Sequence, residues 1–134
     1  GIGFHLGYAE RTPEGRHFNT AILVSEAGEI VDLLGNGFAD IDTQRRSGEV
    51  SPATLNEVFR GAHSLKGLAG MFGIDAISLL AHEMENLLDA LRLGRLALSD
   101  GLIQVLYACN DAFHRLLFVV KNGSLPRFFS PNRP

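Results

Sequence analysis

A histidine and a lysine three residues apart, His63 and Lys66, are the residues of this sequence best suited to chemistry. The apolar positions around them form one helical stripe, and His63 lies roughly 120° from its centre, on the shoulder of the helix. Lys66 and two glycines, Gly67 and Gly70, share that flank. The pattern predicts an accessible imidazole beside an ammonium group. The two glycines have no side chains, so a partner could dock close to the backbone there. The alternative is that Gly70 and Gly73 only end the helix and that His63 is an ordinary surface residue.

A second pair, His82 and Glu85, falls on one flank of the next amphipathic segment, more than about 100° from its apolar stripe. Only a few residues join the two segments, so their helices are antiparallel neighbours, and Glu85 reaches His63 if the two flanks face each other. A carboxylate that accepts a hydrogen bond from one ring nitrogen fixes the tautomer and leaves the lone pair of the other nitrogen free. His63 is then a nucleophile for the phosphorus of ATP or of a phospho-aspartate, and Lys66 offsets the charge of the incoming phosphoryl group. Alternatively, Glu85 pairs within its own helix and His82 is a solvated or half-buried histidine.

Helical periodicity predicts four amphipathic helices that position these side chains. The first starts near Ala21, the second follows the N-cap Ser51, the third is capped by Asp75 and the fourth is opened by Ser99. No segment shows the period-two alternation of a strand. The predicted fold class is therefore all-α, an antiparallel four-helix bundle (up-down-up-down), with or without a short extra C-terminal helix.

The length of 134 residues is that of one domain. Residues 1–20 lack a clear period and are interpreted as a partly ordered N-terminal extension; residues 21–123 form the bundle and residues 124–134 a C-terminal turn and linker. Gly35 and Gly37 interrupt the first helix, where they predict a kink or a close contact with another helix.

Composition excludes several function classes. The net charge of −3 and the scattered arginines leave no basic footprint for nucleic acid. No apolar run approaches the roughly 18 residues of a membrane span, and no signal-peptide pattern opens the chain, so we expect a cytoplasmic protein without membrane insertion. Cys109 is the only cysteine, which rules out an internal disulfide and favours a small core residue.

The two site segments and the entry of the second helix together form an extended pattern. It consists of Asn56-Glu57-Val58-Phe59-Arg60, His63-Ser64-Leu65-Lys66-Gly67, Ala69-Gly70-Met71-Phe72-Gly73 and His82-Glu83-Met84-Glu85-Asn86-Leu87-Leu88-Asp89. This pattern closely resembles the histidine phosphotransfer (HPt) domain of the chemotaxis kinase CheA, and the resemblance runs without an apparent gap from about residue 23 to residue 120.

The resemblance implies that His63 is phosphorylated, that Glu85 is its hydrogen-bond partner, and that Lys66 and His82 support the reaction. It implies a phosphoacceptor of a two-component signalling kinase, with no cofactor of its own, because a separate kinase domain binds the ATP and Mg. The sequence agrees, since it contains no glycine-rich nucleotide loop. The phosphoryl group would pass to an aspartate of a response-regulator receiver domain (CheY- or CheB-like), docked weakly over Gly67 and Gly70, and the domain itself would be monomeric.

Three alternatives remain at this point. The chain could be a stand-alone HPt relay protein, or a scaffold bundle without chemistry. It could also bind a metal, because His63, His82, Glu85 and His114 supply ligand types found in helical bundles. The sequence contains only one His-x-x-Glu motif, however, and lacks the second, symmetry-related motif of such bundle sites. No metal is therefore predicted.

Overall fold

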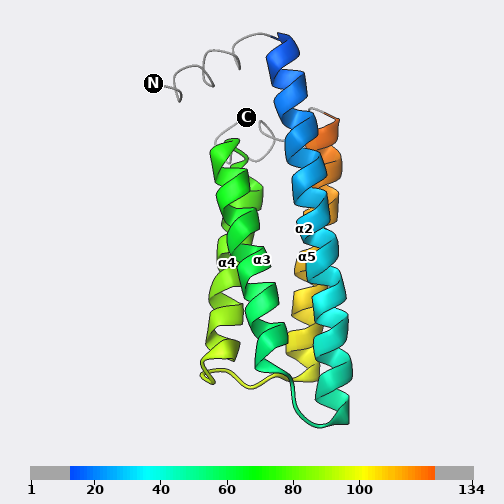
Figure 1. Cartoon of the computed structure of the whole chain (residues 1–134), viewed down its shortest axis with the longest axis vertical. Coiled ribbons are helices and arrows are strands. Elements are labelled where there is room, and N and C mark those ends of the chain that lie inside the picture. Colours follow the sequence, from blue (N-terminus) through cyan, green and yellow to red (C-terminus); the bar gives the residue numbers. More distant parts are fainter. Residues whose placement is uncertain (1–12, 123–134) are drawn as a thin grey trace, which may run out of the picture.

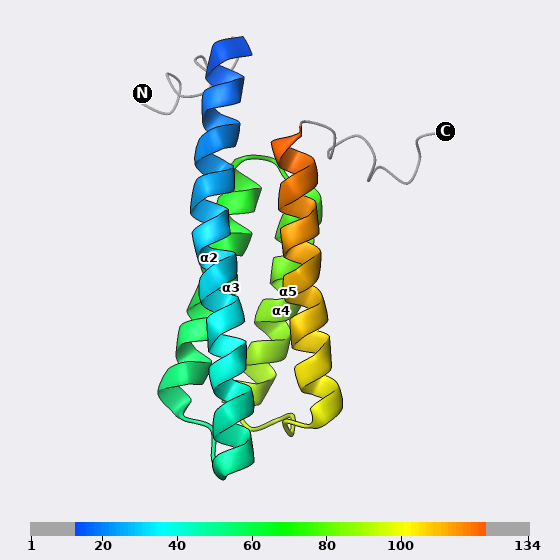
Figure 2. The ribbon, with the colours of Figure 1, turned by 90° about the vertical axis from the view of Figure 1, so that its right-hand side faces the viewer.

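The fold is an antiparallel four-helix bundle. The structure, a computed structural model, describes residues 13–122, and within that range no residue lies in a strand. Successive helices run in alternating directions along one long axis (Figure 1), and α5 packs back against α2 to close the bundle (Figure 2). The helices are α2 (Pro13–Ser47), α3 (Pro52–Met71), α4 (Asp75–Arg92) and α5 (Asp100–Lys121). The predicted all-α up-down-up-down architecture is confirmed; the proposed C-terminal turn and linker lie outside the described residues.

Helix α2 begins earlier than the sequence indicates. Its start is Pro13 rather than a residue near Ala21, so residues 13–20, predicted to be part of an extension, belong to the helix. Proline is compatible with the first helical turn because its missing N–H has no intrahelical partner there. The apolar period marks the part of a helix that packs, and the first buried core residue described in α2 is Leu23. The amphipathic pattern therefore could not locate the true start of the helix.

The other helix ends depend on local hydrogen bonds. Ser51 and Ser99 are N-caps as predicted, and their hydroxyls accept from backbone N–H groups of the first turn. Asp75 is not a cap: Ile74 holds that position without a side-chain hydrogen bond, and Asp75 is the first residue of α4. The reason is the tight turn before it, in which Gly73 has a φ of +73° and the N–H of Ile74 bonds to the last turn of α3. An acidic residue in the first turn still interacts favourably with the helix dipole.

Two glycines allow α2 to approach its neighbours closely. A Cβ atom at Gly35 would lie 3.0 Å from Nδ2 of Asn110 on α5, and one at Gly37 would clash with Cγ1 of Val58 on α3. The predicted close helix contact is therefore present, with a different helix at each glycine.

One continuous core fills the bundle, with buried side chains from every described helix. In α5 the buried stripe is centred on Ile103, Asn110 and Leu117, and Cys109 is only half-buried at its edge, where burial raises the pKa of its thiol. The expectation that Cys109 is a core residue is thus only partly met. Among the described residues, no helix is long and apolar enough to span a membrane.

Candidate functional site

The site lies where α3 and α4 pack side by side, and each helix contributes part of it. His63 and Lys66 come from one flank of α3, three residues apart, and Glu85 comes from the facing flank of α4. The short turn after α3 makes the two helices antiparallel neighbours. The structure therefore brings together the residues that the flank argument placed opposite each other.

Both oxygens of the Glu85 carboxylate are engaged. Nδ1 of His63 lies 2.5 Å from Oε2, and the Lys66 ammonium donates to Oε1 at 2.6 Å. An ionised carboxylate only accepts hydrogen bonds, so Nδ1 of His63 carries its proton toward Glu85. The lone pair of neutral His63 is thereby assigned to Nε2, the other ring nitrogen.

His63 and Glu85 differ sharply in exposure. The His63 side chain is 62% exposed, whereas that of Glu85 is 11% exposed. Nε2 of His63 has no hydrogen-bond partner among residues 13–122. A nearly buried carboxylate thus holds an imidazole that is itself largely exposed to solvent. The sequence predicted the flank on which Glu85 lies but not its burial.

The electrostatics of Glu85 follow from these contacts. Burial of the carboxylate raises its pKa, but the hydrogen bonds and charges of Lys66 and His63 outweigh that effect, and the pKa lies below its ordinary value. Glu85 is therefore ionised at neutral pH. Lys66, placed by sequence beside His63, is bound to the same carboxylate instead of standing free.

The lowered pKa of Glu85 predicts a pH dependence of stability. Its contacts stabilise the fold above the unfolded-state pKa of about 4.3, and this contribution is lost as the pH falls through the lower folded-state pKa. We expect the difference in unfolding free energy between wild type and Glu85→Gln to be largest above about pH 5 and to shrink on acidification. Urea denaturation of both chains at a series of pH values measures this difference. A difference in unfolding free energy that grows as the pH falls would contradict the prediction.

The predicted supporting residue His82 is more peripheral. Its Nδ1 lies 3.8 Å from Oε1 of Glu85, and its side chain is 49% exposed. Two polar neighbours were not predicted: Asn86 lies one turn after His82, with Nδ2 at 3.5 Å from its Nε2, and Ser78 donates to the backbone carbonyl of Lys66. The four-residue step from His82 to Asn86 was a signal that sequence alone could have used.

The two glycines predicted as a docking surface lie on exposed positions of α3. A Cβ atom at Gly67 would meet no heavy atom within 4 Å, so the space beside it is open. A Cβ atom at Gly70 would lie at an ordinary 3.7 Å from Oγ of Ser78 on α4. Gly67 is thus the more open of the two positions.

A metal centre finds no geometric support in the described part of the chain. No group of three or more His, Cys, Asp or Glu side chains there could hold a metal ion, although His63, His82, Glu85 and His114 are the required residue types. Both Glu85 oxygens also face hydrogen-bond donors, one of them the cation of Lys66.

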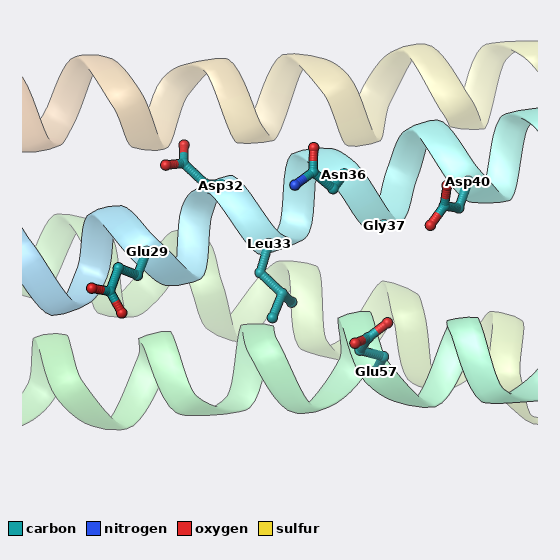
Figure 3. Close-up of a pocket in the computed structure, with 7 residues that line it drawn as sticks. All are labelled: Glu29, Asp32, Leu33, Asn36, Gly37, Asp40 and Glu57. Atoms are coloured by element: carbon teal, nitrogen blue, oxygen red, sulfur yellow. The ribbon is translucent and has the colours of Figure 1, made fainter.

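A separate pocket of about 440 Å³ lies between α2 and α3 (Figure 3). It contains none of the predicted site residues. Four carboxylates and no basic residue line it, which disfavours the binding of phosphate or nucleotide. Its lining consists of Glu29, Asp32, Leu33, Asn36, Gly37, Asp40 and Glu57.

Comparison with known proteins identifies relatives over most of the bundle. Residues 20–117 match the family model described as Hpt domain. The chain is 35% identical over 107 residues to Chemotaxis protein CheA of Cereibacter sphaeroides, a match that covers 80% of this chain and 16% of that protein. It is 37% identical over 102 residues to Chemotaxis protein CheA of Rhizobium meliloti, covering 76% of this chain and 13% of that protein.

A solved structure also matches this chain. The CheA phosphotransferase domain from Thermotoga maritima superposes with a TM-score of 0.71 at 25% identity, covering 78% of this chain and 95% of that one. The chain thus spans at most about a sixth of the two curated relatives but nearly all of an isolated domain. It belongs to the Hpt domain family and is an Hpt domain of the CheA type.

Proposed function

We propose that this domain is a phosphoryl relay in which His63 accepts a phosphoryl group and passes it to an aspartate of a receiver domain. The observation that carries the proposal is the His63–Glu85 pair: Nδ1 is tied to a carboxylate at 2.5 Å, and the exposed ring leaves Nε2 free. An imidazole held in this way is oriented and cannot present the wrong nitrogen.

The first step is an attack of the Nε2 lone pair on the γ-phosphorus of ATP, which a separate kinase domain binds together with Mg. The N–P bond forms while the bond between the γ-phosphorus and the bridging oxygen breaks, and ADP leaves with that electron pair. The ring becomes positively charged while Nδ1–H stays bound to Glu85, whose charge stabilises it. Lys66 anchors the carboxylate and adds positive charge near the incoming phosphoryl group.

The second step returns His63 to its starting state. A carboxylate oxygen of the receiver aspartate attacks phosphorus, the N–P bond breaks, and its electron pair returns to Nε2. The names of the relatives support a pathway in chemotaxis, with the kinase in the same polypeptide or, for a stand-alone relay, in another protein. We place this relay in the cytoplasm, where CheY- or CheB-like receivers would be its partners.

The test is phosphorylation of the full 134-residue chain by the ATP-binding kinase region of a CheA relative with γ-labelled ATP. We expect label that is stable in base and lost in acid, the behaviour of a phosphoramidate, and that moves to an added receiver domain. The relative's own Hpt domain serves as the positive control. Acid-stable label on this chain, or no label while the control is phosphorylated, would contradict the proposal.

Glu85→Gln should slow phosphorylation of His63 about tenfold without abolishing it. The variant keeps the size of the side chain but removes the charge that orients the ring and stabilises its positive form. Asp89→Asn is the matched control, because Asp89 lies on the same helix in an exposed pair with Arg92. Initial labelling rates measure the effect, and equal rates for wild type and Glu85→Gln would show that the two residues are not coupled.

Gly67→Leu should slow transfer from phosphorylated His63 to a receiver by on the order of tenfold, a loss equivalent to about 1.4 kcal/mol. The new side chain would fill open space beside His63 and obstruct a close approach. Stability should not fall, because glycine within a helix is unfavourable. Gly28→Leu, at an equally open position on α2, is the control. Unchanged transfer in Gly67→Leu would refute docking at this flank.

A further inference from the structure

Asn86 follows Glu85 in the sequence, and its side chain reaches the site through His82. It lies one helical turn after His82 on α4, and its Nδ2 is 3.5 Å from Nε2 of that histidine. The other ring nitrogen, Nδ1, is turned toward Oε1 of Glu85 at 3.8 Å. The His82 ring therefore lies between the amide of Asn86 on one side and the carboxylate of Glu85 on the other.

The two contacts of His82 select the same tautomer. In this structure the Asn86 amide turns its nitrogen toward the ring; an amide nitrogen only donates, so in this orientation Nε2 is the acceptor and does not carry the proton of the neutral ring. The proton then resides on Nδ1, which faces an ionised carboxylate that can only accept. In the opposite tautomer, the Nδ1 lone pair would face the negative oxygen and the Nε2 proton would face the amide hydrogens.

We propose that Asn86 is a positioning residue of the phosphoacceptor site, which acts by holding His82 in the Nδ1–H tautomer. Oε1 of Glu85 then faces Lys66 and the Nδ1–H of His82, while Oε2 remains directed at His63. The reaction role rests on the proposed function of His63, whereas the tautomer of His82 does not depend on it.

The expected consequence of losing the Asn86 amide is a mixed population of His82 tautomers. Molecules with an Nδ1 lone pair would repel Oε1, and the carboxylate would turn away from its best alignment with His63. Because the His82 side chain is 49% exposed, water replaces part of the lost hydrogen bond. The effect on His63 should therefore be modest, about two- to fivefold in rate.

Nitrogen NMR of the imidazole rings tests the tautomer directly. In the ¹⁵N-labelled chain, at a pH where the histidines are neutral, we expect His82 to be predominantly Nδ1–H, with its signals assigned by their loss in His82→Gln. Asn86→Leu, of similar size but without an amide, should shift the population toward Nε2–H. Asn36→Leu on α2 is the matched control and should change nothing at His82. An Nε2–H ring in wild type, or no shift in Asn86→Leu, overturns the assignment.

A double-mutant cycle tests whether Asn86 acts through His82. Asn86→Leu should lower the rate of His63 phosphorylation about two- to fivefold in the wild-type background and have no effect in His82→Gln. An undiminished effect in His82→Gln would overturn the proposal. If the wild-type chain takes up no phosphoryl group at all, the proposed function fails and the positioning role with it, while the NMR result still decides the tautomer.

Discussion

Replacing His63 with glutamine should reduce phosphoryl uptake by at least about a thousandfold, a loss of roughly 4 kcal/mol in the stabilisation of the transition state. Glutamine has an amide nitrogen at a similar distance from the backbone, but its lone pair is delocalised into the carbonyl and is not nucleophilic. Glu85 and Lys66 cannot replace Nε2 of His63, because Glu85 is tied to two donors and Lys66 is bound to Glu85. The measurement is the initial rate of label incorporation from γ-labelled ATP.

This variant should remain folded, so the loss can be assigned to chemistry. The His63 side chain is 62% exposed, and a glutamine amide can still donate to the Glu85 carboxylate. We expect its unfolding free energy to lie within about 1 kcal/mol of wild type. His114→Gln is the matched control: His114 is an exposed histidine on α5 and should leave labelling intact. Labelling of His63→Gln at the wild-type rate would end the assignment of His63.

Much of the fold could be predicted because its signals are local. Ser51 and Ser99 cap helices through hydrogen bonds to residues two or three positions away. The apolar stripes predicted the four helices, and the short connections predicted that neighbouring helices are antiparallel. The pairing of His63 with Glu85 followed from the same two signals, because adjacent antiparallel helices turn predictable flanks toward each other.

The features that could not be predicted from the sequence depend on tertiary packing. Glu85 is nearly buried because α3 covers it, and no property of α4 alone reveals that cover. Asn110 is 7% exposed inside the bundle, and its polar residue type gives no sign of that burial. The partner of Lys66 was also missed, because the spacing along α3 suggested a neighbour of His63 and not a ligand of the facing carboxylate.

Gly37→Ala should destabilise the bundle by about 2–3 kcal/mol, although alanine is the better helix former. The added methyl group would overlap Cγ1 of Val58, which is fully buried on α3. A β-branched side chain in a helix has one strongly preferred rotamer, so Val58 cannot turn away. The helices themselves would have to move apart, which would loosen the core on both sides of the contact.

Urea denaturation of four chains tests this contact: wild type, Gly37→Ala, Val58→Ala and the double variant. In Val58→Ala the clashing Cγ1 atom is absent, and the remaining Cβ atom would lie at an ordinary 3.8 Å from the new methyl group. The double variant should therefore be more stable than the sum of the single losses predicts, since each change fills or relieves the space altered by the other. Gly28→Ala, in the same helix but with no heavy atom within 4 Å of its added Cβ, should gain up to about 1 kcal/mol. A Gly37→Ala chain that gains stability as Gly28→Ala does would show that α2 and α3 are not in close contact at this position.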